Sequence, residues 1–184
     1  MTNLLPAHLP AMLPGRPAAH LGPRDGAKTW RTDVHLGWRV DHIQPTPGSV
    51  RVRTRPEGVT VVIGDGPDSR PWCTTVQLDA DGTASVRTSA SPPCVLLTPR
   101  DVRVVPDGPE NRGSVQLDAG DRLLVMSAEA LGALPEALSA MRTAARQPVD
   151  TDHPEDLLKC LLQDLPTGAA AVVVWTSRTT SVRD

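Results

Sequence analysis

The chain contains no phenylalanine and no tyrosine, so tryptophan is its only aromatic residue type. The aromatic side chains are therefore those of Trp30, Trp38, Trp72 and Trp175. Aromatic residues supply much of the buried apolar area in most domains. We expect a core built mainly from valine, leucine and alanine, and a domain of marginal stability.

The chain also lacks an excess of charge of one sign. Its 19 Lys and Arg and 21 Asp and Glu are mixed along the sequence and give a net charge of −2, which does not indicate a general affinity for nucleic acid or for an anionic membrane. Its three cysteines, Cys73, Cys94 and Cys160, are widely spaced, which argues against a disulfide framework and a cysteine-rich zinc site. No segment has the roughly 20 consecutive apolar residues of a membrane span. We expect a cytoplasmic protein.

Proline and glycine are abundant instead, with 19 and 14 residues respectively. They are concentrated in residues 6–71 and 92–109, so the first half of the chain should be rich in loops and short strands. Leu-Pro pairs at 5–6, 9–10 and 13–14 predict that residues 1–26 form an extended arm, because each proline restricts its predecessor. The length suits one domain, which we place at residues 27–178, before a polar tail over 179–184.

Short apolar or alternating runs predict strands throughout the middle of the chain. They cover residues 34–43, 50–54, 59–63, 74–78, 83–88, 94–97, 102–105, 115–117, 122–126 and 169–175. Polar turns at 79–82, 99–101 and 118–120 predict three hairpins, so we expect mostly antiparallel sheet. Leucines at helical spacing predict helices over 128–145 and from Pro154 onward.

Asp65 is the strongest candidate for a metal ligand. It follows the predicted buried strand 59–63 and lies between Gly64 and Gly66, at a rigid edge from which a carboxylate can reach a cation. Two-metal hydrolysis needs several carboxylates, however, to balance about four positive charges. We expect the five histidines to occupy surface or half-buried strand positions, and Cys73 and Cys94 to be small buried hydrophobic residues at strand starts. The alternating arginines at 51, 53 and 55 should form a solvated strand face.

Four segments carry motifs in a recognisable order. They are Leu4-Leu5-Pro6, Val61 to Asp65, Ser89 to Leu97 and Gly120 to Met126. Their order resembles that of the metal-dependent (PPM-type) serine/threonine protein phosphatases, especially the SpoIIE-like branch. The resemblance implies an α/β (α+β) sandwich of largely antiparallel sheets, and it implies that Asp65 corresponds to a metal-binding aspartate.

The chain departs from this family where the family's metal ligands lie. The family's Thr-Asp-Gly corresponds to Ser127-Ala128-Glu129, and its closing Asp-Asp corresponds to Thr167-Gly168. The helical segment that follows the metal aspartate in the family is largely missing after Asp65. The family's first acidic pair falls near Trp30 or Trp38, where only a shifted Asp33 or Asp41 could replace it.

We therefore expect a PPM-phosphatase-like sandwich with a reduced helical layer, no catalytic residues and no cofactor, which acts as a pseudophosphatase that binds a regulatory protein. The resemblance implies a partner-switching pathway, in which the partner is an anti-sigma factor, its STAS-fold antagonist or a phosphatase paralogue.

Two alternatives stay open. One is a manganese- or magnesium-dependent phosphoserine phosphatase whose displaced ligands are Asp65, Glu129 and either Asp33 or Asp41. The other is a structural module that forms a homodimer, because a shortened helical layer would leave an apolar sheet face in need of cover.

Overall fold

The computed structural model describes residues 28–44, 49–64, 72–107, 109–145, 154–162, 165 and 168–176. The predicted arm, the polar tail and Asp65 lie outside these ranges. Among the described residues, no helix is both long and apolar enough to span a membrane.

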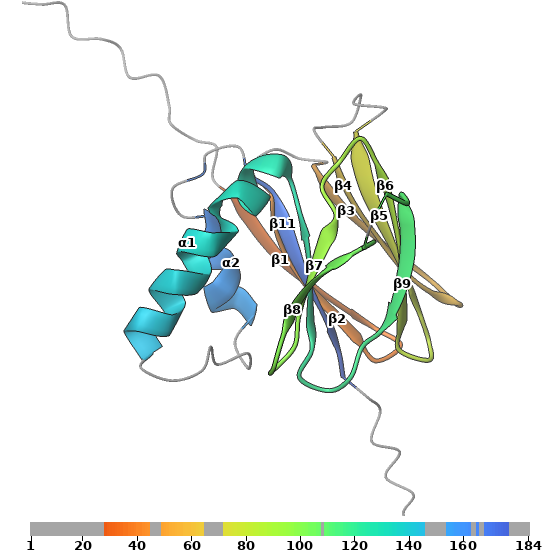
Figure 1. The fold of residues 1–184 in the computed structure, drawn as a ribbon. Helices are drawn as coiled ribbons and strands as arrows, with labels where there is room; N and C mark the ends of the chain where they lie inside the picture. The colour runs from red at the N-terminus through yellow and green to blue at the C-terminus, as the bar shows by residue number, and fades with distance from the viewer. Residues whose placement is uncertain are drawn as a thin grey trace, which may run out of the picture.

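The described strands form two sheets that pack face to face (Figure 1). Sheet A has the order β1-β2-β11-β10-β7-β8, and sheet B has the order β3-β4-β5-β6-β9. The strands are β1 (Thr29–His35), β2 (Trp38–Gln44), β3 (Val50–Arg55), β4 (Gly58–Gly64), β5 (Cys73–Asp79), β6 (Thr83–Ser89), β7 (Cys94–Leu97), β8 (Val102–Val105), β9 (Arg112–Gln116), β10 (Arg122–Met126) and β11 (Ala170–Trp175). Every pairing is antiparallel, as predicted.

The structure corrects two of the predicted strand arrangements. The single strand expected over 34–43 is instead the hairpin β1–β2, which turns at Leu36 and Gly37 with φ angles of 49° and 82°. The hairpin expected around residues 118–120 does not form, because β9 pairs with β6 in sheet B whereas β10 pairs with β7 and β11 in sheet A. The turn after Leu117 therefore connects the two sheets. The other two predicted hairpins, β5–β6 and β7–β8, are confirmed.

The core between the sheets consists mainly of valine, leucine and alanine, in agreement with the composition. Trp38 is the fully buried aromatic side chain in this layer, and its ring lies 4.7 Å from that of Trp175, measured between ring centroids. The indole Nε1 of Trp38, in sheet A, donates a hydrogen bond of 2.7 Å to the carbonyl oxygen of Asp79, in sheet B. This contact ties the two sheets together without leaving a buried indole N–H unpaired.

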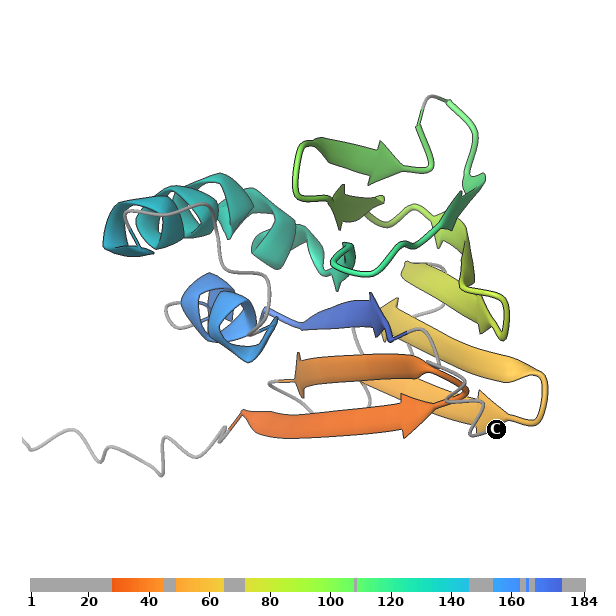
Figure 2. The ribbon, with the colours of Figure 1, turned by 90° about the horizontal axis from the view of Figure 1, so that it is seen from below.

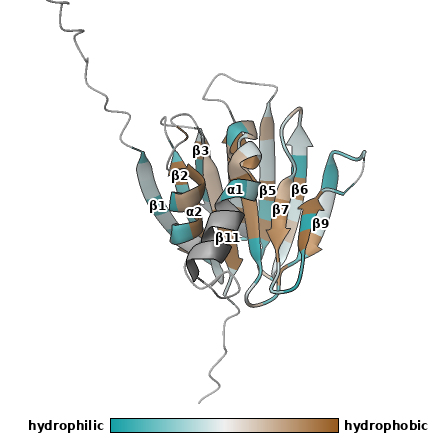
Figure 3. Ribbon diagram, turned by 60° about the vertical axis from the view of Figure 1, so that its left-hand side comes forward, coloured by the Kyte–Doolittle hydropathy of each residue, from teal (hydrophilic) through white to brown (hydrophobic). Residues whose placement is uncertain are grey.

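Both helices, α1 (Ala128–Ala145) and α2 (Pro154–Leu162), lie on the outer face of sheet A (Figure 2). Their leucines pack on a second apolar cluster that includes Ile43, Leu124 and Val172. Strand β7, which is predominantly hydrophobic in Figure 3, contributes to both clusters. The central strands of sheet A, β2, β11, β10 and β7, are therefore buried on both sides, whereas the edge strands β1 and β8 are largely exposed.

No described helix covers the outer face of sheet B (Figure 1). The residues that alternate outward on its strands are mostly polar or charged. They include Arg51, Arg53, Arg55, Thr60, Thr75, Gln77, Ser85, Arg87, Arg112 and Ser114. The expectation of an apolar sheet face that needs cover is thus wrong, because this face is suited to water; the homodimer itself stays a prediction.

Candidate functional site at one end of the sandwich

A cavity of about 130 Å³ lies where strands of both sheets end. Strand β4 reaches it at Gly64, β10 reaches it just after Met126, and the connection from β6 to β7 lines it. Its lining consists of Ile63, Gly64, Trp72, Ala90, Ser91, Pro92, Ser127 and Ala128. The fold thus brings together parts of three of the segments that the sequence singled out, at Gly64, at Ser91-Pro92 and just after Met126.

Ser127 serves as the N-cap of helix α1. Its Oγ accepts hydrogen bonds from the backbone N–H groups of Ala130, at 3.4 Å, and of Ala169, at 3.2 Å. Its own N–H donates to the carbonyl oxygen of Ala169 at 2.9 Å. A serine at this position satisfies a backbone donor that the helix leaves free. Ser127 is therefore committed to holding the start of α1 against the start of β11.

Ala128 is the first residue of α1, and it is exposed where it borders the cavity. It therefore presents a methyl group at the position where the family resemblance implies an aspartate. The next residue, Glu129, is exposed and does not line the cavity. Successive helical residues differ in direction by about 100°, and an acid in the first helical turn is favourable next to the helix N-terminus. Glu129 is thus placed to stabilise α1.

Asp41 is fully buried and paired on the helix-covered side of sheet A. Its Oδ1 accepts hydrogen bonds from Thr32 Oγ1, at 2.6 Å, and from Arg39 Nη2, at 3.1 Å. Arg39 Nε lies 2.7 Å from Asp41 Oδ2, which completes a two-pronged ion pair. Charged side chains are buried in proteins mainly when they are paired in this way. Asp41 is therefore a structural carboxylate.

Asp33 lies on the opposite side of the same sheet. It is paired in register with Val40, a residue of the core between the sheets, and its Oδ2 lies 3.1 Å from Nε2 of buried His42. Burial lowers the pKa of His42, while the hydrogen bond and the charge of Asp33 act in the opposite sense. Because neighbouring strand residues project from opposite faces, Asp33 and Asp41 cannot bind the same ion.

The structure consequently does not bring Asp33, Asp41 and Glu129 together. Within the described ranges, no three His, Cys, Asp or Glu side chains converge as a metal site would require. Asp65 follows Gly64, which lines the cavity, but Asp65 itself lies outside the described residues. The cavity lining that the structure describes contains no carboxylate.

The hydroxyls of Ser91 and Ser127, which line the cavity, and that of neighbouring Thr74 already have partners. Thr74 Oγ1 lies 2.9 Å from Ser91 Oγ and donates to the carbonyl oxygen of Pro92 at 2.8 Å. Trp72 lines the cavity although its side chain is 52% exposed. Sequence reasoning missed Trp72 and Thr74; the only indication was a large aromatic residue directly before a strand. The cavity is thus weakly polar and is not equipped for acid or base chemistry by the described residues.

No family model and no curated protein matches the chain. Among solved structures, it is similar to the phosphatase domain of SpoIIE from Bacillus subtilis, with a TM-score of 0.50, 14% identity, and coverage of 82% of this chain and 100% of that domain. A Mycobacterium tuberculosis protein with RsbU and RsbW domains has a TM-score of 0.43, 14% identity, and coverage of 84% and 56%. The M. tuberculosis serine/threonine phosphatase PstP has a TM-score of 0.43, 10% identity, and coverage of 80% and 97%. The similarity to SpoIIE, at this level of identity, concerns the fold: the chain has a PPM-type phosphatase-like fold of mostly antiparallel sheets.

Proposed function

We propose that this chain is a pseudophosphatase, a PPM-like domain that binds a regulatory protein and does not hydrolyse phosphoserine. The observation that carries the proposal is the cavity at the ends of β4 and β10. It presents the methyl group of Ala128 where the family resemblance requires a carboxylate. Its other described lining side chains supply no acid in place of that carboxylate.

The chemistry of metal-dependent hydrolysis supports this reading. A pair of divalent ions needs several converging carboxylates to hold it and to activate a water molecule. Loss of even an outer partner of a metal ligand typically costs about 10- to 100-fold in affinity or activity. Replacement of direct ligands by Ala128, and by Thr167-Gly168 before the last strand, should therefore abolish such a centre.

The other acids of the described chain are not in a position to replace these ligands. Asp41 forms an ion pair with Arg39 on the helix-covered side of sheet A, and Asp33 is hydrogen-bonded to His42. Glu129 lies on the exposed side of the first turn of α1. Among the acids that the structure describes, none would therefore join Asp65 at the cavity, and a single carboxylate does not hold two cations.

The regulatory role follows from the resemblance to SpoIIE-like phosphatases together with the fold. A domain that has the sandwich fold and lacks the ligands can bind a protein without hydrolysing it. We propose that it acts in a cytoplasmic partner-switching pathway. Its partner would be an anti-sigma factor, a STAS-fold antagonist or a phosphatase paralogue.

Turnover of a phosphoserine protein in the presence of about millimolar manganese or magnesium tests this proposal. The wild-type chain, Asp65→Ala and Ala128→Asp should all release phosphate at the rate of a protein-free control. Glu136→Gln, at an exposed position of α1, is the matched surface control. Hydrolysis by the wild-type chain that is lost in Asp65→Ala would instead support the metal-dependent phosphatase.

A further inference from the structure

The outer face of sheet B carries an unusual concentration of arginine. Arg51, Arg53 and Arg55 alternate along β3, Arg87 lies on β6 and Arg112 lies on β9. All five are exposed. They account for 5 of the 19 basic residues of a chain whose net charge is −2, so the rest of the molecule is distinctly more acidic than this face.

The strand register aligns three of these arginines across the sheet. Arg51 is paired with Val62, Val62 with Thr75, Thr75 with Arg87, and Arg87 with Arg112. Neighbouring strands are about 4.8 Å apart, so the four steps from Arg51 to Arg112 span about 19 Å. An extended peptide covers that distance with about six residues.

Arg87 and Arg112 are directly opposite each other in adjacent strands. Like charges in this arrangement destabilise a sheet, and an arginine cannot relieve the repulsion by losing its proton. No acidic side chain in the described part of the chain forms an ion pair with either residue. On the same face, Arg55 of β3 forms an exposed ion pair with Glu57 at 3.9 Å. An unfavourable pair of this kind is relieved when an anion binds between the two groups.

The surroundings of this arginine pair suit an anionic peptide. A shallow hollow of about 590 Å³ runs over β5, β6 and β9, and Thr75, Gln77, Ser85 and Ser114 line it together with the two arginines. Guanidinium groups bind carboxylates with two parallel hydrogen bonds, and the amide and hydroxyls can bond a peptide backbone. The hollow contains no aromatic residue, so the stacking on which single-stranded nucleic acids depend has no platform there.

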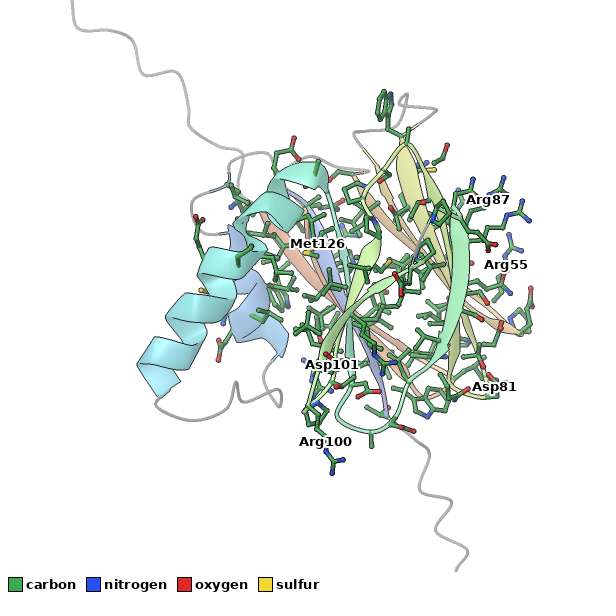
Figure 4. The ribbon with its side chains drawn as sticks, in the orientation of Figure 1. Arg55, Asp81, Arg87, Arg100, Asp101 and Met126 are labelled. Carbon is green, nitrogen blue, oxygen red and sulfur yellow. The ribbon has the colours of Figure 1, made fainter. Side chains whose placement is uncertain are left out.

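We propose that the outer face of sheet B docks an extended acidic segment of a partner protein, held by Arg87 and Arg112 at one side and by the β3 arginines at the other. The inference rests on the proposed function in one respect, namely that a protein partner exists. It does not depend on whether the cavity at the end of the sandwich is active. Figure 4 shows Arg55 and Arg87 on the side of the molecule away from the helices.

Fluorescence anisotropy with a labelled peptide of ten alternating Glu and Ser residues tests the surface. We expect saturable binding that weakens as salt rises from 50 to 300 mM, because exposed charges are screened over about 10 Å at 0.1 M salt. The double variant Arg87→Ala/Arg112→Ala should weaken binding about tenfold or more, since hydrogen bonds to charged groups are its main contacts. Its thermal unfolding midpoint should not fall, because the substitution removes a repulsion.

The matched control is Arg100→Ala/Arg103→Ala. It removes the same charge from exposed residues of the β7–β8 hairpin in sheet A (Figure 4). An equal loss of affinity in this control, or no binding by the wild-type chain, would overturn the proposal. Tighter binding of a single-stranded DNA of equal charge, or complete competition by millimolar inorganic phosphate, would also overturn it, by assigning the face to nucleic acid or to a small anion.

The anisotropy assay is independent of the phosphatase assay. Metal-dependent turnover would refute the pseudophosphatase and leave the peptide result unaffected. Absence of both turnover and peptide binding would refute only the docking surface.

Discussion

Replacing Asp41 by asparagine separates a structural carboxylate from a metal ligand. The substitution keeps the shape of the side chain and removes its charge, while Arg39, on the same strand, keeps its own. Asp41 is fully buried, and three contacts of 2.6 to 3.1 Å hold it. We therefore expect Asp41→Asn to be clearly destabilising.

The magnitude follows from the burial of the two partners. Breaking a buried ion pair by removing one charge costs about 3–5 kcal/mol. The side chain of Arg39 is 36% exposed, so its guanidinium can recover part of its hydration, and asparagine still offers one oxygen to Thr32. We expect a loss of about 2 kcal/mol in the free energy of unfolding. For a chain of this length that corresponds to a fall of about 4–8 °C in Tm.

The control is a substitution of Asp33, which lies on the strand β1 that pairs with β2. Asp33→Asn alters a carboxylate on the neighbouring strand that is 42% exposed and faces the other side of the sheet. Its cost should be about 1 kcal/mol or less. Urea and thermal unfolding of both variants, with and without manganese, measure the difference. If Asp41→Asn left the metal-free protein as stable as the wild type and abolished a stabilisation by manganese, our assignment of Asp41 would be wrong.

Three further substitutions test other parts of the account. Ser127→Ala should cost about 1–2 kcal/mol in chemical denaturation, because it removes the cap of α1 and one acceptor for Ala169; Thr98→Ala, in an exposed turn, is the comparison. His42→Gln should reduce the pH dependence of stability. The folded-state pKa of His42 lies below its ordinary value of 6.5, so the folded chain binds fewer protons than the unfolded chain. The wild-type protein therefore loses stability as the pH falls below about 6.5. Unfolding midpoints at pH 7.5 and pH 5 should therefore differ less in the variant than in the wild type. Ala128→Asp should restore neither metal-dependent stabilisation nor turnover, because a single returned acid does not complete the ligand set.

Local patterns predicted the hairpins that depend on local chemistry. The turn before β6 contains Gly82, whose φ of 93° is a conformation that suits glycine, and Asp81 accepts a hydrogen bond from the backbone of Thr83. The turn at Gly120 has a similar φ of 97° and similar polar residues. It nevertheless connects two sheets, because β9 has its partner in β6 and β10 has partners in β7 and β11. A local sequence does not reveal those long-range pairings.

The β1–β2 hairpin was missed for a different reason. Its turn places Leu36, a residue with a branched side chain, at a positive φ, which composition does not suggest. Reading 34–43 as one strand also left Asp33 outside it. The pairing of β1 with β2 places Asp33 and Asp41 on opposite faces of sheet A, and the pairing of β6 with β9 makes Arg87 and Arg112 cross-strand neighbours. Neither pairing is encoded in a local pattern. The individual site residues could be predicted from motifs, whereas their relative placement required the pairing of strands.

We propose that the cavity between β4 and β10 does not hold a catalytic metal. Titration of the wild-type chain with manganese, followed by calorimetry and by Tm, tests it most directly, because a ligand bound by the native state alone raises Tm by mass action. We expect no saturable heat and no rise in Tm up to about millimolar manganese. Saturable binding that raises Tm in the wild-type chain and disappears in Asp65→Ala would contradict it.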